Sequence, residues 1–205
     1  EIPLKKVTEN ISVLELFHGP TLAFKDVGAR FMSRCLGYFL KNETRKVTVL
    51  VATSGDTGGA VANGFYDVEG IEVVILYPKN RVSPVQEKQL TALGKNIHAL
   101  EVNGSFDDCQ ALVKQAFSDE SLTEKLLLTS ANSINVARWL PQQIYYVLAL
   151  KQWLKIHSEN PVICVPSGNF GNICAGILAH HRGLPVEHFI AACNDAQNDA
   201  ANRRG

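Results

Sequence analysis

The feature of this sequence that most constrains its fold is the regular alternation of short apolar runs with helical stretches. Several runs are continuously apolar and rich in β-branched residues, as in strands of a sheet that is covered on both faces. We therefore predict strands at residues 11–17, 46–53, 71–78, 96–102, 161–166 and 188–193. Apolar residues that recur near helical spacing predict helices at residues 26–41, 57–67, 83–93, 106–118, 134–156 and 171–182.

Strand and helix in alternation indicate βαβ units, so we predict an α/β fold with a mostly parallel, twisted sheet and flanking helices. In such sheets, ligands bind beyond the carboxyl ends of the strands. Functional residues are therefore expected in the loops that lead from a strand into a helix, and three of these loops have unusual sequences.

The first unusual loop, at residues 17–26, places Lys25 among apolar residues at the start of a helix. An ammonium group in an apolar pocket loses hydration, so its pKa falls and the neutral amine becomes available. A neutral amine is what Schiff-base formation with an aldehyde requires. The alternative is a solvated lysine beside Asp26 at a helix start, which is the more common situation for a lysine.

The second loop, TSGDTGGA at residues 53–60, directly follows an apolar strand. Its glycines allow the backbone to approach a ligand closely, and its serine and threonine residues supply hydroxyl groups. The following helix offers free N–H groups to an anion. A carboxylate or a phosphate would fit this loop. The alternative is a tight turn whose small residues serve packing.

The third loop, PSGNFGN at residues 166–172, again combines glycines with a helix N-terminus, as in a phosphate cradle. It matches neither of the glycine-rich patterns of dinucleotide-binding and Walker-type loops, and an ordinary glycine turn is the alternative. Together, an amine and two anion sites suit a cofactor that carries an aldehyde and a phosphate and acts on an amino acid.

Composition argues against several classes of function. Lys+Arg and Asp+Glu both number 20, which gives no support to a surface for nucleic acid or an anionic membrane. No stretch reaches the roughly 18 apolar residues of a membrane span. Five dispersed cysteines without a CxxC pair indicate reduced thiols. We therefore expect a cytoplasmic protein and no metal site.

Several long segments resemble threonine synthases, which are fold type II (tryptophan-synthase-like) pyridoxal-phosphate (PLP) enzymes. ELFHGPTLAFKD at residues 15–26 is similar to their lysine motif, and TSGDTGGA to their substrate loop. ILYPKNRVSPVQEKQL, SANSINVARWLPQQIYY and VPSGNFGNICAG are similar to later segments, in the same order. The resemblance runs from about residue 4 to residue 194.

This resemblance implies a role for each loop. Lys25 is implied to be the catalytic lysine that forms the Schiff base with PLP. The residues implied to bind the cofactor phosphate are Ser167, Gly168, Asn169, Phe170, Gly171 and Asn172. The residues implied to bind the substrate are Ser54, Gly55, Asp56, Thr57, Gly58, Asn132, Ser133, Asn135 and Arg138.

Two of these residues raise questions of their own. Arg138 is the preferred partner of a substrate phosphate, because a guanidinium group matches phosphate geometry; the alternative is a surface arginine on a long amphipathic helix. Asp56 stands where many family members have asparagine, and an ionised carboxylate there would repel the phenolate oxygen of the cofactor ring.

The implied reaction is the PLP-dependent conversion of O-phospho-L-homoserine and water to L-threonine and phosphate, catalysed by a carbon–oxygen lyase. The implied partner is this small-molecule substrate, with no nucleic acid and no membrane, in a monomer or homodimer. Two alternatives stay open. One is another fold type II lyase, such as a threonine or serine dehydratase, which the long lysine motif disfavours. The other is a non-catalytic PLP- or phosphate-binding relative or an inactive fragment.

The resemblance also predicts how the chain is divided. Residues 1–45 are expected to carry the cofactor lysine as a segment of a large domain, residues 46–145 to form a smaller α/β substrate-binding domain, and residues 146–194 to return to the large domain. Residues 195–205 are small and polar and are expected to form an irregular tail. We expect an incomplete fold, because family members have further segments at both ends, one of which supplies a hydroxyl group to the pyridine nitrogen.

Overall fold

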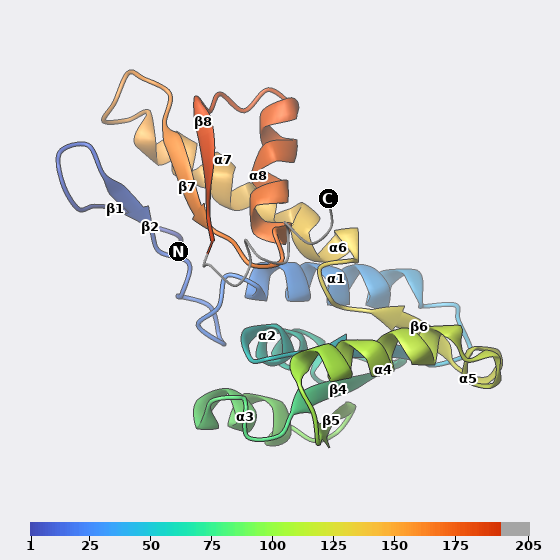
Figure 1. Ribbon diagram of the computed structural model, residues 1–205. Helices are drawn as coiled ribbons and strands as arrows, with labels where there is room; N and C mark the ends of the chain where they lie inside the picture. Colours follow the sequence, from blue (N-terminus) through green and yellow to red (C-terminus); the bar gives the residue numbers. More distant parts are fainter. Residues whose placement is uncertain (194–205) are drawn as a thin grey trace, which may run out of the picture. The chain divides into compact units, whose positions relative to one another are not determined.

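The computed structural model describes residues 1–193, which fold into two compact units (Figure 1). One unit is Leu16–Arg138, and the other combines Glu1–Glu15 with the chain from Trp139 onward. The predicted tail at residues 195–205 lies outside the described residues. The predicted domain boundaries at residues 45 and 145 differ from this division, and the predicted roles of the domains stay predictions.

The unit Leu16–Arg138 is built on a four-stranded parallel sheet with the strand order β5-β4-β3-β6. Its strands are β3 (Val47–Ala52), β4 (Ile71–Pro78), β5 (Ile97–Val102) and β6 (Leu127–Ser130). Val47 is in register with Ile71 on one side and with Leu127 on the other. Every residue of β3 is buried, as expected for the centre of a parallel sheet with both faces covered.

Helices cover both faces of this sheet. The helices of the unit are α1 (Asp26–Phe39), α2 (Asp56–Phe65), α3 (Pro84–Thr91), α4 (Phe106–Ser118) and the short α5 (Glu120–Lys125). The side chains of Val49 and Val51 pack in a core with α1, α2 and α3. Leu50 and Ala52 pack in a second core with α4. The alternation of faces along β3 thus separates the two cores.

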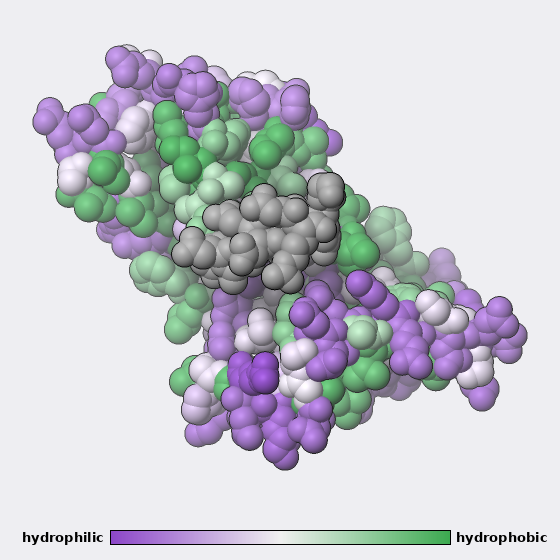
Figure 2. Space-filling view, in the orientation of Figure 1, coloured by the Kyte–Doolittle hydropathy of each residue, from purple (hydrophilic) through white to green (hydrophobic). Residues whose placement is uncertain are grey.

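The second unit contains a parallel pair of strands, β7 (Val162–Pro166) and β8 (His188–Ala192), and an antiparallel hairpin. The hairpin consists of β1 (Leu4–Lys6) and β2 (Ser12–Leu14). The helices of this unit are α7 (Gln143–Trp153), which directly follows the 3₁₀ turn η1 (Leu140–Gln142), and α8 (Gly171–His181). Figure 2 shows apolar side chains over β7 and β8, where Val162 and Ile190 are each about half exposed.

The sequence predicted most of these elements, with two corrections. The helix predicted at residues 134–156 is interrupted: α6 (Val136–Trp139), η1 and α7 follow one another, because Pro141 has no N–H group for a continuous helix. The strand predicted at residues 11–17 is shorter and pairs antiparallel with β1. No helix in the described part of the chain combines the length and apolar character needed to cross a membrane.

Gly64 allows α2 to pack directly on α1. A Cβ atom at Gly64 would lie 3.0 Å from both the carbonyl carbon and the Cβ of Ala29, closer than real Cβ contacts normally are. We expect Gly64→Ala to lower the free energy of unfolding by about 1–3 kcal/mol, measured by urea denaturation.

Gly37→Ala is the matched control, since this glycine lies within α1 and a Cβ there would be 3.5 Å from Cγ1 of Val68. Ordinary contact and the better helix propensity of alanine predict no loss of stability, and a gain of about 0.5–1 kcal/mol. Equal losses in the two variants would contradict the tight contact between α1 and α2.

Candidate active site

Lys25 lies at the N-cap position of α1, where its carbonyl accepts a hydrogen bond from the N–H of Ala29 at 3.0 Å. Its side chain is only 27% exposed, and its Nζ lies 5.2 Å from the centre of the Phe24 ring. Burial lowers the pKa of Lys25; Asp56 opposes this shift, and Arg138 adds to it. Lys25 is therefore not the freely solvated lysine of the alternative interpretation.

A buried carboxylate, Asp26, holds the loop that precedes Lys25. Its oxygens accept hydrogen bonds from the hydroxyl and the N–H of Thr21. A Cβ at Gly19 would lie 2.3 Å from Oδ2 of Asp26, so only glycine leaves room for this arrangement. Sequence reasoning treated Asp26 as a helix-start residue and missed its function in the loop, because the bond partner depends on how the loop folds back.

Thr53 organises the second predicted loop, which joins β3 to α2. Its buried hydroxyl accepts the N–H groups of Gly55 at 3.0 Å and Gly58 at 2.9 Å, and donates to the carbonyl of Gly55. Gly55 has φ +152°, a conformation that other residues rarely adopt. Sequence reasoning placed Thr53 in this loop but assigned it no role.

This turn leaves backbone donors available. In the part of the chain that the structure describes, no hydrogen bond occupies the N–H of Asp56 or of Thr57, the first two residues of α2. Ser54 is exposed beside them. The turn can therefore accept an anion at the N-terminus of a ten-residue helix.

The predicted residues after β6 mainly stabilise their own loop. The side-chain amide of Asn132 bonds both backbone groups of Ala52, at 3.1 and 2.7 Å, and so ties the ends of β6 and β3 together. The side chain of Asn135 bonds the carbonyl of Ser130 and the N–H of Ala137. Ser133 is exposed between them.

Arg138 is 4% exposed and donates from Nη1 to the carbonyl of Ala131 at 2.7 Å. Burial lowers its pKa to about 10, while Asp26 acts in the opposite direction. Arg138 is thus not the surface arginine of the alternative interpretation. It contributes a buried positive charge to the surroundings of Lys25, and its predicted contact with a phosphate stays a prediction.

In the other unit, the third predicted loop forms a turn between β7 and α8 that side-chain hydrogen bonds stabilise. Asn172 donates from Nδ2 to the carbonyl of Pro166 at 2.7 Å and closes the turn. The hydroxyl of Ser167 donates to the carbonyl of Val165 at 3.0 Å. The hydroxyl of Tyr146, to which the sequence analysis assigns no role, donates to the carbonyl of Asn172 at 2.6 Å.

The tip of this turn presents successive backbone donors. Phe170 adopts a left-handed conformation with φ +57° directly before the first residue of α8. Residues 168–170 are exposed. Among the described residues, no hydrogen bond occupies the N–H groups of Gly168, Asn169, Phe170 or Gly171. Such a succession of N–H groups makes a concavity that suits an anion.

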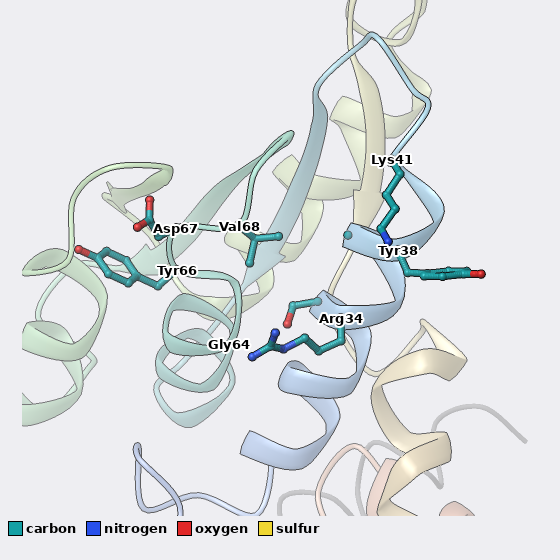
Figure 3. Close-up of a pocket in the computed structure, with 9 residues that line it drawn as sticks. Arg34, Tyr38, Lys41, Gly64, Tyr66, Asp67 and Val68 are labelled. Atoms are coloured by element: carbon teal, nitrogen blue, oxygen red, sulfur yellow. The ribbon is translucent and has the colours of Figure 1, made fainter.

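A separate pocket of about 500 Å³ lies where α1 packs near the end of α2 (Figure 3). Arg34 extends from α1 toward Gly64 of α2, and Lys41 lies close to Tyr38, with Nζ 5.2 Å from the centre of its ring. Asp67 at its rim pairs with Lys95. None of the predicted site residues lines this pocket.

Comparison with known proteins gives consistent matches along the chain. Residues 4–204 match the family described as "Pyridoxal-phosphate dependent enzyme". The threonine synthase of Haemophilus influenzae is 54% identical over 201 residues, which are 98% of this chain and 46% of that protein. The chain thus spans about half the length of the curated relatives it matches.

Solved structures give the same result. The crystal structure of threonine synthase from Escherichia coli has a TM-score of 0.90 at 51% identity, over 99% of this chain and 46% of that chain. The structure of PLP-bound threonine synthase from Brucella melitensis has a TM-score of 0.85 at 45% identity, over 95% of this chain and 42% of that chain. The predicted fold class is therefore confirmed.

The hydroxyl of Thr53 is expected to be essential for the turn before α2. Thr53→Val keeps the shape of the side chain but leaves the N–H groups of Gly55 and Gly58 without this acceptor. We expect a loss of about 2 kcal/mol or more in the free energy of unfolding, measured by urea denaturation.

Thr53→Ser is the control, because it keeps the hydroxyl and removes only a buried methyl group, which costs about 1 kcal/mol. Indistinguishable unfolding midpoints for the valine and serine variants would show that the three hydrogen bonds of the hydroxyl do not stabilise the turn.

Proposed function

Because the chain belongs to the family of pyridoxal-phosphate dependent enzymes, as its motifs predict, we propose that the protein containing it is a threonine synthase. The reaction is the conversion of O-phospho-L-homoserine and water to L-threonine and phosphate. The observation that carries the proposal is the largely buried amine of Lys25, within the lysine motif at residues 15–26. Burial lowers the pKa of this amine. Relatives that carry the name threonine synthase support the same reaction.

The residues present fit the cofactor of this family. A poorly hydrated amine suits the PLP aldehyde, because the neutral form is the nucleophile. The turn at residues 168–171 offers successive N–H groups, which suit the PLP phosphate. When bound, PLP supplies an aldehyde that joins to amines and a ring that withdraws electrons from the Cα of an amino acid.

In this proposal, Lys25 acts first as the amine that holds the cofactor and then as the group that moves protons. Burial lowers the pKa of its amine, and the hydrogen-bonded loop before α1 holds it in one place. With the substrate bound, the free Lys25 amine would take and return protons at Cα and Cβ of the substrate.

The substrate is bound by groups around the loop after β3. The N–H groups of Asp56 and Thr57 and the hydroxyl of Ser54 bind the substrate carboxylate, as anions bind at helix N-termini. Arg138 contributes positive charge that attracts the substrate phosphate. Asn132 and Asn135 stabilise the loop that carries Ser133 toward the same ligand.

The protein is proposed to act in the cytoplasm, which is supported by the dispersed cysteines, none of which forms a disulfide in the described part of the chain. It is proposed to act as a monomer or homodimer on a small-molecule substrate, without nucleic acid.

Trapping of the cofactor tests the role of Lys25. The chain is incubated with PLP and then treated with borohydride, which makes a bond between the cofactor aldehyde and an amine permanent. Peptide mapping is expected to find the label on Lys25. Lys25→Arg, which keeps the charge but has no reactive amine, is expected to lose it, whereas the exposed-lysine control Lys41→Arg keeps it.

Phosphate release from O-phospho-L-homoserine tests the reaction in the protein that contains this chain. Lys25→Arg is expected to lower the rate by about 10²–10⁴-fold, and Lys41→Arg to leave it unchanged. Labelling of a different lysine, or undiminished phosphate release in Lys25→Arg, would refute the role of Lys25. Deamination of threonine or serine without phosphate release would favour the dehydratase alternative.

A further inference from the structure

A chain of polar contacts connects the start of α3 to the Lys25 amine, entirely within the unit Leu16–Arg138. The hydroxyl of Ser83, the N-cap of α3, donates to Oε1 of Gln86 at 3.0 Å. Nε2 of Gln86 donates to Oδ1 of Asp56 at 2.5 Å. The other carboxylate oxygen, Oδ2 of Asp56, lies 3.6 Å from Nζ of Lys25.

The orientation of the Gln86 amide follows from its two partners. Ser83 accepts the backbone N–H of Gln86 with its hydroxyl oxygen, so its hydroxyl hydrogen is available to donate to Oε1. A carboxylate only accepts, so the amide nitrogen must face Asp56. Both contacts require the same orientation, which leaves Gln86 as a fixed donor to Asp56.

The position of Gln86 is fixed by the packing of α3 on α2. Leu90 is 1% exposed, and a Cβ at Gly58 would lie 2.6 Å from its Cδ2, so the two helices meet there without spare room. A Cβ at Gly55 would lie between 2.6 and 2.7 Å from three atoms of the Gln86 amide. The Gln86 amide therefore packs closely on the turn that precedes Asp56.

The separation of Asp56 from Lys25 is informative. A direct hydrogen bond between an ammonium and a carboxylate is about 2.7–2.9 Å long, so at 3.6 Å the two groups form an ion pair that is longer than a well-formed hydrogen bond. Among the described residues, the charged groups that influence Lys25 are Asp56 on α2 and Arg138 on α6, and Asp26 in turn influences Arg138. With Gln86 bound to Oδ1, the carboxylate is satisfied without moving onto Lys25.

We propose that Gln86, oriented by Ser83, is a positioning residue that holds the Asp56 carboxylate just short of a direct bond with Lys25 and so keeps the amine accessible to an aldehyde. This inference rests on the proposed function, in which Lys25 is the reacting amine. Without the Gln86 donor, the ammonium of Lys25 is the adjacent donor to Asp56. The ion pair then shortens to a direct hydrogen bond, and the amine stays protonated to higher pH.

The test measures Lys25 directly and uses no cofactor. The chain is treated with trace acetic anhydride over a range of pH, and acetylation of Lys25 is quantified by peptide mass spectrometry. Gln86→Leu removes the amide donor to Asp56 and puts an apolar side chain of similar size in its place. It is expected to slow acetylation of Lys25 by about three- to tenfold at neutral pH and to move the midpoint of the pH profile upward.

Gln89→Leu is the matched control, because Gln89 lies on the same helix, is similarly half-buried, and makes no hydrogen bond to Asp56. Its pH profile is expected to match that of the unchanged chain. Ser83→Ala, which leaves the Gln86 side chain in place, serves as a second variant should Gln86→Leu fail to fold; it is expected to shift the profile in the same direction by less.

A double variant separates positioning from general disturbance. In an Asp56→Asn background there is no carboxylate to move, so Gln86→Leu is expected to have no further effect on acetylation. An unchanged or lowered midpoint in Gln86→Leu, or an equal shift in the Asp56→Asn background, would overturn the proposal. Failure of borohydride labelling at Lys25 would instead refute the proposed function and leave the acetylation result intact, so the two failures are distinguishable.

Discussion

The geometry around Lys25 depends on one buried charge, the carboxylate of Asp26. It binds the hydroxyl and the N–H of Thr21, excludes a side chain at Gly19, and opposes the effect of burial on Arg138. A buried carboxylate is costly unless it is hydrogen-bonded or paired with a charge, and here the loop before α1 supplies the bonds. The loop and the helix start therefore stabilise each other, which fixes where the chain delivers the amine. Thr53 and Asn172 act in a similar way, because a hydrogen bond between each of these polar side chains and the backbone closes its turn.

Much of the fold was predictable, because a parallel sheet buried on both faces leaves a strong signal in the sequence. The strands at residues 46–53 and 71–78 correspond to β3 and β4 almost residue for residue. Where the signal is weak, the prediction was incomplete. β6 has only four residues, all partly buried, and β1 has only three residues, two of which are exposed, so neither is distinguishable from a loop by periodicity. The break of the long helix at Pro141 was visible in the sequence, but the helical pattern on both sides of the proline favoured one continuous helix.

The candidate site was predictable in its location and less so in its contacts. Motifs pointed to Lys25, to the turn after β3 and to the turn after β7, since each follows a strand and begins a helix. They did not distinguish residues that face a ligand from residues that hold the loop. Asn132 and Asn135 belong to the second kind in their observed hydrogen bonds, as does Thr53. Gln86 lies thirty positions from Asp56 and on another helix, so only the folded arrangement of α2 and α3 brings the two together.

The arrangement also gives a physical reason for an aspartate at position 56, where the resemblance implies asparagine in many relatives. Two influences lower the pKa of Lys25, its burial and the positive charge of Arg138, and Asp56 is the group that opposes them. An asparagine would still accept the hydrogen bond from Gln86 but would leave both influences unopposed. The amine would then lose its proton at a lower pH, but it would also be a weaker base for the proposed proton transfer at Cα. A carboxylate held 3.6 Å away limits the fall in pKa without capturing the amine in a direct bond. Because the hydrogen bond from Gln86 occupies Oδ1, the position of α3 becomes part of the control of Lys25, although no residue of α3 contacts the amine in the contacts described above.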